Sequence, residues 1–173
     1  IGKEYSIMDT MSLTAKYEDE MIAIRRHIHR HPELSNKEYK TTEFIREKLT
    51  EYGVEIAEIG MKTGVVAVIR GGKPGKTVAI REDIDALPMK EETGLPFCSI
   101  NGKMHACGHD FHTSALLGAA KLLKAHELFC ILSTKNALSS ESAFVLKSVF
   151  FYKLHKLLHI RITAYCSVLC NAQ

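Results

Sequence analysis

Apolar residues recur along the first fifty positions with the period of an α-helix. Five of them are spaced by four, four, three and four residues, which predicts one apolar helix face: Leu13, Tyr17, Met21, Ile24 and Ile28. Pro32 is expected to end that helix. Ser35 and Glu38 form a capping-box pattern ahead of a second apolar face, and Gly53 suits its C-terminal cap. The pattern therefore predicts a second helix between these caps.

Strand-like runs follow the two helices. Val54–Ile59 and Gly64–Ile69 read as strands, the second nearly all apolar as in a buried strand. Glycines and Pro74 predict a turn, and Thr77–Arg81 is expected to be the returning strand. Apolar positions within Thr113–His126 predict another helix. This order predicts an α/β fold, a sheet covered by helices.

The composition of the chain changes after Glu127. Residues 128–173 contain no Gly, Pro or Asp, and Glu141 is their only acid, although folded α/β domains place such residues at turns. We therefore expect two parts, a domain over residues 1–127 and an unmatched, helical tail over residues 128–173. A reading-frame change or a truncation junction near Glu127 is our hypothesis for this difference.

Composition and charge narrow the classes of function. Hydrophobic residues make up 46% of the 173 residues and charged residues 25%, the balance of a soluble globular protein. A net charge of +3 is too small to indicate a nucleic-acid partner. The five cysteines are odd in number and residues 1–17 do not read as a secretory signal, so we expect a reducing cytoplasm. No apolar run is long enough to span a membrane.

A histidine-rich and cysteine-containing segment carries the candidate chemistry. In His105–His112 (HACGHDFH), Cys107 and His109 lie two residues apart on a glycine-containing loop and could face one metal ion. Thiolate and imidazole suit zinc and similar transition metals. Asp110 and His112 could orient a ligating imidazole. On spacing alone, a purely structural role for the Cys-x-His pair is equally open.

A second segment places two carboxylates after a predicted strand. Asp83 and Asp85 would point into the crevice beyond the carboxyl end of the sheet, where they could bind or orient metal ligands. The alternative is a solvated acidic turn closed by Pro88. His27, His29 and His31 lie at the end of the first helix, where cationic side chains suit the carbonyl end of the dipole, and we read them as scaffold or site-adjacent residues rather than as ligands.

Three ordered motifs resemble one family. The stretches Arg25–Glu33 (RRHIHRHPE), Asp83–Pro88 (DIDALP) and His105–Thr113 (HACGHDFHT) resemble the N-terminal part of the M20 metallopeptidases. The similar branch contains hippurate hydrolase, N-acyl-L-amino-acid amidohydrolases and auxin-conjugate hydrolases. The resemblance implies a partial M20-type catalytic domain with a sheet flanked by helices.

The resemblance also implies site residues, cofactors and substrate. Cys107 would be a ligand between two divalent ions, Zn²⁺ or Mn²⁺, and His109 a second ligand. Asp85 would orient a metal-bound group and support the catalytic base, while the role of Asp83 is left open. The implied reaction is hydrolysis of an N-acyl amino acid or related amide by a metal-activated water. No nucleic-acid partner is expected, and the oligomeric state is left open.

The sequence departs from the family after the second metal ligand. The family's adjacent glutamates would fall near Glu141, which has no acidic neighbour, and its later histidines are not matched by His155 and His159. We therefore expect little or no hydrolase activity from this chain. The alternatives are a non-catalytic metal-binding or interaction module and a membrane-surface role for the tail. Phosphate-binding glycine loops and a Gly-x-Ser-x-Gly elbow are absent, which argues against nucleotide binding and serine hydrolysis.

Overall fold

The computed structural model describes residues 10–71, 77–133 and 142–148. Three helices and four strands occur in these ranges. The helices are α1 (Thr10–Arg30), α2 (Tyr39–Glu51) and α3 (His109–Ser133). The strands are β1 (Glu55–Ile56), β2 (Val65–Gly71), β3 (Val78–Glu82) and β4 (Ser142–Ser148).

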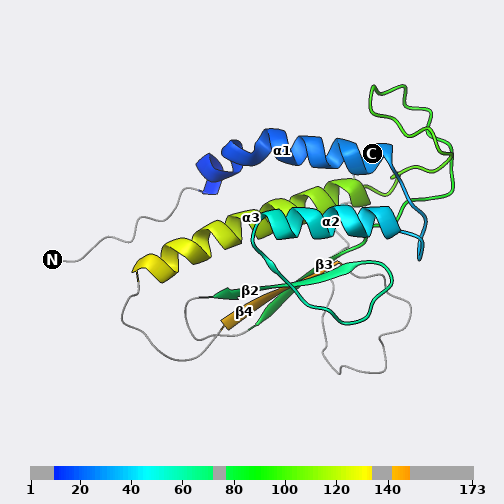
Figure 1. The fold of residues 1–173 in the computed structure, drawn as a ribbon. Helices are drawn as coiled ribbons and strands as arrows, with labels where there is room; N and C mark the ends of the chain where they lie inside the picture. Colours follow the sequence, from blue (N-terminus) through cyan, green and yellow to red (C-terminus); the bar gives the residue numbers. More distant parts are fainter. Residues whose placement is uncertain (1–9, 72–76, 134–141, 149–173) are drawn as a thin grey trace.

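The strands form one mixed sheet with the order β1-β2-β4-β3. Strand β4 runs antiparallel to β2 and parallel to β3, with Leu146 opposite both Ala67 and Ile80. The three helices lie on one side of the sheet, as Figure 1 shows. Helices α2 and α3 contact the strands, and α1 packs on α3 as an outer layer. The described part is thus an α/β fold, as the sequence predicts.

The core lies between the sheet and the helices. Strand β2 is buried along most of its length, which explains its nearly continuous apolar sequence. The helices contribute apolar residues at helical spacing, so each turns one stripe toward the centre. The buried apolar residues of the helices are Ile24, Ile28, Ile45, Leu49, Leu117 and Ala120.

The start of α2 differs from the predicted capping box. The helix begins at Tyr39 after Glu38, whose side chain makes no capping hydrogen bond to the helix and is completely buried. Glu33 caps the helix instead, since its Oε2 accepts a hydrogen bond from the backbone N–H of Thr41 at 2.8 Å. The prediction of a Ser35–Glu38 capping box was therefore wrong. The loop folds back so that a carboxylate from outside the pattern reaches the unpaired N–H groups.

Most predicted elements are present, with two differences in the sheet. The strand predicted over Val54–Ile59 is paired only at Glu55–Ile56. The predicted returning strand, β3, does run opposite to β2, but β4 lies between them. The predicted glycine turn falls on residues 72–76, outside the described residues.

The region around the predicted tail is described only in part. Helix α3 continues through Glu127 to Ser133, so the expected boundary falls inside a helix. For residues 142–148 the expected helix was wrong, because they form β4. Their sequence includes the apolar run Ala143–Leu146, which suits a strand paired on both sides. Glu141, His155 and His159 lie outside the described residues. Within the described ranges, none of the helices is both long and apolar enough to cross a membrane.

Candidate metal centre

Two of the predicted site residues, Asp85 and His109, meet beyond the carboxyl end of β3. After Glu82 the chain continues extended, and Ile84 is buried at 2% exposure, which anchors the acidic segment on the core. The following loop is held by backbone hydrogen bonds. The N–H of Ala86 donates to the carbonyl of Glu33 at 2.7 Å, and Leu87 exchanges two hydrogen bonds with Met104. Asp85 is thereby fixed between two anchored neighbours.

A glycine turn brings the second motif to the same place. The N–H of Gly108 donates to the carbonyl of His105 at 3.2 Å, and α3 starts at the next residue. Gly108 has φ of +82°, a left-handed conformation in which a side chain is strained. The turn therefore presents Cys107 just before the helix and His109 on its first turn.

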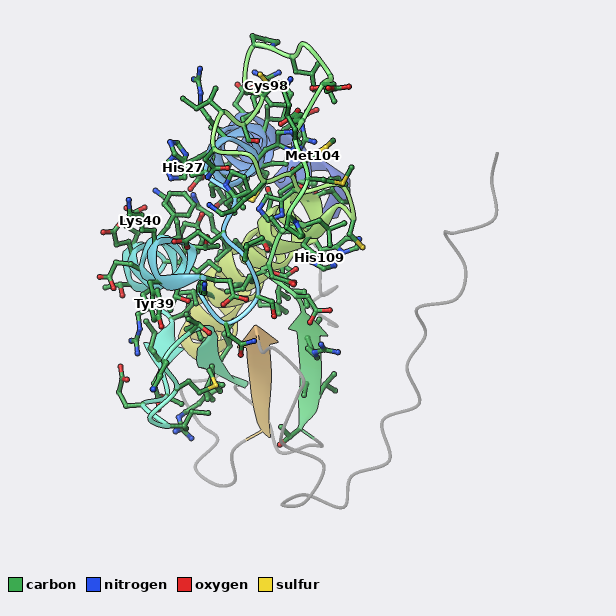
Figure 2. All side chains as sticks on the ribbon, turned by 90° about the vertical axis from the view of Figure 1, so that its right-hand side faces the viewer. His27, Tyr39, Lys40, Cys98, Met104 and His109 are labelled. Carbon is green, nitrogen blue, oxygen red and sulfur yellow. The ribbon has the colours of Figure 1, made fainter. Side chains whose placement is uncertain are left out.

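His109 and Asp85 are directly bonded, although 24 positions separate them. The Nδ1 of His109 lies 2.9 Å from the backbone carbonyl of Asp85 and 3.0 Å from its carboxylate Oδ1. Both oxygens are acceptors, so Nδ1 carries the proton and donates, which leaves the Nε2 lone pair free. Figure 2 shows His109 just beyond the tip of β3. Carboxylate-bonded histidines of this kind are the usual arrangement of metal-ligating imidazoles.

Cys107 supplies a second donor that, like imidazole, prefers zinc and similar transition metals. Its thiol is free and exposed, two residues before His109 on the glycine turn. Thiolate and imidazole are zinc-type ligands, so the chemistry of the two donors fits a divalent transition metal. Within the described ranges, however, no group of three or more His, Cys, Asp or Glu side chains is placed to hold an ion. The described residues thus offer part of a ligand set.

The other predicted polar residues of the two motifs lie in different environments. Asp83 forms an ion pair with Arg81 at the surface, away from the His109–Asp85 pair. His112 is exposed, and its ring centroid lies 6.3 Å from that of His109. Asp110 is buried and bonds to other residues than His109. The proposed orienting role therefore falls on Asp85 in this geometry. Cys98 is a free, half-buried cysteine.

A buried ionic cluster lies beneath the glycine turn. Asp110 accepts a hydrogen bond from the Nδ1 of His29 at 2.8 Å and forms an ion pair with Arg25 at 2.7 Å. The Nε2 of His29 lies 2.9 Å from Glu91. Sequence reasoning placed His29 correctly in the last turn of α1 and read it as a scaffold or site-adjacent residue, but it did not single out Glu91.

Two titratable side chains in and beside the cluster have shifted pKa values. Burial acts to raise the pKa of Glu91, but hydrogen bonds from Thr93, the Ser99 N–H and His29 bring that pKa down to about 2. His105 is buried, and neither of its ring nitrogens has a hydrogen-bond partner in the described part of the chain. Burial lowers the pKa of His105 to about 4, so its imidazole is neutral at pH 7.

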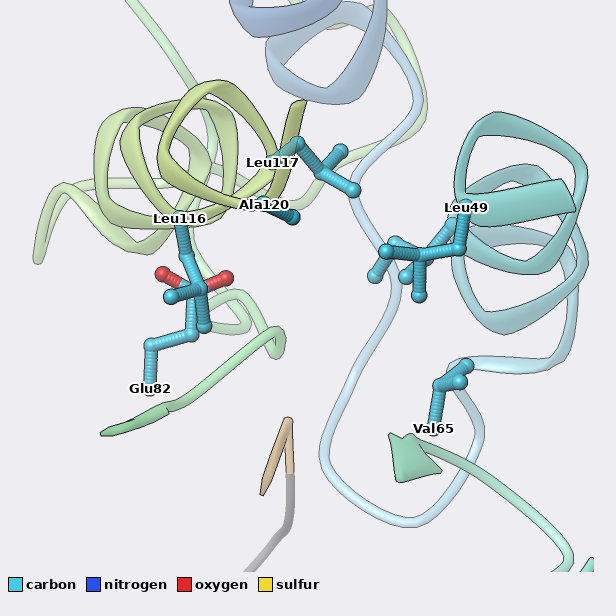
Figure 3. A pocket seen from close by; sticks show the side chains of 7 residues that line it. Leu49, Val65, Glu82, Leu116, Leu117 and Ala120 are labelled. Atoms are coloured by element: carbon cyan, nitrogen blue, oxygen red, sulfur yellow. The ribbon is translucent and has the colours of Figure 1, made fainter. Parts of the chain in front are cut away.

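Glu82 places a further carboxyl in an apolar setting. Burial, with Asp83 adding to it and Thr113 opposing it, raises the pKa of Glu82 to about 8. Figure 3 shows its carboxyl group beside Leu116, in a small pocket between β3 and the helices. The other described residues that line this pocket are Ile45, Leu49, Val65, Leu117 and Ala120.

Comparison with known proteins shows similarity to one family. Residues 79–130 match the model of Peptidase family M20/M25/M40. The chain is 56% identical over 111 residues to N-acetyl-L-cysteine deacetylase of Bacillus subtilis, covering 64% of this chain and 27% of that protein. The chain is therefore similar to part of an M20-family protein. A relative of another kind is Thermostable carboxypeptidase 1 of Saccharolobus solfataricus, 57% identical over 108 residues that cover 61% of this chain and 28% of the relative.

A solved M20 structure shows the same similarity. The YXEP protein of Bacillus subtilis, described as a dinuclear metal binding peptidase from the M20 family, superposes with a TM-score of 0.66 at 43% identity. The superposition covers 76% of this chain and 35% of that one. The chain therefore spans about a quarter to a third of the length of these M20 relatives.

Proposed function

We propose that Cys107 and His109 bind divalent metal, and that the M20-type domain hydrolyses the amide bond of N-acyl amino acids. The observation that carries the proposal is the bonded Asp85–His109 pair, with the free thiol of Cys107 two residues before His109 in the sequence. A bound divalent ion would supply an activated water and would polarise the amide carbonyl. The ligands' thiolate and imidazole character favours Zn²⁺, with Mn²⁺ as the alternative.

Asp85 has two tasks in this proposal. Its carbonyl and carboxylate both accept from Nδ1 of His109, which holds the imidazole in the tautomer whose Nε2 is free. The hydrogen bond also fixes the orientation of the ring, which favours metal binding through Nε2. Because the backbone carbonyl remains, Asp85→Asn should keep the tautomer and weaken metal binding by about tenfold.

The substrate class rests on what the relatives are. One is a deacetylase of an N-acetyl amino acid and another a carboxypeptidase, and both names describe an amide next to an amino acid. We therefore propose an N-acyl amino acid or a related small amide as substrate. The free thiols of Cys98 and Cys107 suit a reducing compartment, and we propose the cytoplasm.

The activity of the chain on its own is proposed to be low. A catalytic zinc needs three protein ligands, and the described residues offer two. A second candidate function follows from the same observation: a module that binds metal without turnover. The two candidates differ in catalysis and agree in metal binding, so one experiment separates them.

The test combines metal binding with turnover. The purified protein is titrated with Co²⁺ and Zn²⁺ and assayed with N-acetyl amino acids, beside Cys107→Ala and the matched control Cys98→Ala. We expect a thiolate-to-cobalt absorption band that Cys107→Ala removes and Cys98→Ala keeps, with little turnover. Efficient turnover would establish the enzyme and refute the metal-only module. Absence of metal binding in the unaltered protein would refute both.

A further inference from the structure

His29 is the central residue of the buried ionic cluster, which the proposed reaction does not use. Its side chain is 4% exposed and lies between the carboxylates of Asp110 and Glu91, which are 1% and 0% exposed. One ring nitrogen faces each carboxylate, at 2.8 Å and 2.9 Å. Buried charges of this kind are costly unless each one is paired, so the cluster holds its side chains in a single arrangement.

The Asp110 end of this cluster lies at the glycine turn that carries Cys107 and His109. Asp110 follows His109 directly, in the first turn of α3. Its carboxylate Oδ2 is held by His29 and by Arg25, both on the last turns of α1. The direction of the first turn of α3, and hence of His109, is therefore tied to α1.

At the other end of the cluster, Glu91 holds the loop that leads into the glycine turn. Glu91 Oε1 faces His29, and its Oε2 accepts the N–H of Ser99 at 2.6 Å. The hydroxyl of Ser99 in turn donates to the carbonyl of Lys103, two residues before His105. The loop is thereby anchored shortly before the turn that carries Cys107.

We propose that His29 is a positioning residue, which aligns Cys107 and His109 for metal binding by holding both ends of this turn. The proposal rests on the proposed metal-binding function. A residue of purely structural importance would contribute to folding without affecting how these two donors are presented. His29 touches neither donor, so its effect is carried by Asp110 and Glu91.

Two readouts separate positioning from stability. Ring-nitrogen NMR of the metal-free protein reports whether His109 carries its proton on Nδ1, and Co²⁺ titration reports the affinity of the donor pair. The variants are His29→Ala and the milder Glu91→Gln, which decides the question if His29→Ala fails to fold. The controls are Glu92→Gln, whose side chain is 78% exposed, and Leu49→Ala, a core residue of α2 that lowers stability alone.

We expect the unaltered protein and both controls to keep the Nδ1–H form of His109 and a common Co²⁺ affinity. His29→Ala should mix the two ring tautomers and weaken Co²⁺ binding by at least about tenfold, with Glu91→Gln changing both in the same direction. Unchanged tautomer and affinity in both variants would overturn the proposal, as would an equal loss in Leu49→Ala. If the unaltered protein binds no Co²⁺, metal binding fails and the tautomer of His109 alone decides the role of His29.

Discussion

Glu82 should make the stability of this domain fall as the pH rises. Its carboxyl group lies in the apolar pocket beside Leu116, where burial raises its pKa from an ordinary 4.5 to about 8 (Figure 3). The decisive change is Glu82→Gln, which keeps the size and hydrogen-bonding capacity of the side chain but cannot ionise.

The size of the effect follows from the difference between the folded and unfolded chains. Between pH 4.5 and about 8, the folded protein retains the Glu82 proton while the unfolded chain has released it. Stability then decreases by about 1.4 kcal/mol per pH unit, because the folded state binds more protons. Below pH 4.5 both states are protonated and the loss is absent. Over the whole window the loss amounts to about 5 kcal/mol, a large share of the stability of a typical domain.

Urea denaturation followed by circular dichroism measures this effect. The free energy of unfolding is determined at several pH values between about 4 and about 9 for the unaltered protein, Glu82→Gln and the exposed control Glu92→Gln. The difference between the protein and each variant cancels the titration of all other groups. We expect Glu82→Gln to gain stability relative to the protein as the pH rises, by several kcal/mol at about pH 8.

Two results would refute this reasoning. A stability difference between the protein and Glu82→Gln that does not change with pH would mean that the carboxyl group titrates normally. A difference that grows toward low pH would mean that its pKa is lowered, and that the ionised form has a partner in the pocket. Glu92→Gln should follow the unaltered protein throughout.

Three further changes test the local structure. Glu33→Ala removes the acceptor for the Thr41 N–H and should cost about 1 kcal/mol of stability in urea denaturation. The control Glu43→Ala, at an exposed site of α2, should be nearly neutral, and equal effects of the two changes would contradict the capping role of Glu33. Gly108→Ala should cost roughly 1–2 kcal/mol through φ alone, because an added Cβ meets nothing within 4 Å, and an unchanged melting temperature would contradict this. A chain ending at Ser133 lacks the strand between β2 and β3 and should lose cooperative unfolding; an unchanged urea midpoint would show that β4 is dispensable.

The helices and the buried strand β2 were predictable because their patterns are local. An apolar stripe at helical spacing has one low-energy solution, in which it faces a core, and Ile24 and Ile28 are buried as that spacing requires. The position of β4 was not predictable in this way. Its place between β2 and β3 depends on pairing with strands more than sixty residues earlier in the chain, and a short apolar run does not distinguish a strand from a helix.

The start of α2 shows how a local signal fails when a distant group competes. Ser35 and Glu38 have the spacing of a capping box, but Glu38 is fully buried, and burial raises its pKa. Glu33 reaches the helix from five residues further back because the chain between them folds into a turn. The pattern placed the N-cap three residues too early, at Ser35 instead of Glu38, and tertiary packing decided which carboxylate caps the helix.

The same distinction separates the two groups of site residues. Asp85 and His109 are marked by the motifs in which they stand, so sequence reasoning could single them out before their 3.0 Å contact was known. His29 also stands in one of the motifs, but it bonds to residues 62 and 81 positions away, and the motif does not indicate these partners. The pairing of His29 with Asp110 and Glu91 leaves no periodic trace in the sequence, because it joins three segments that lie far apart along the chain. It is visible only once the fold has brought the three segments together, and for that reason the positioning role of His29 had to be inferred from the structure.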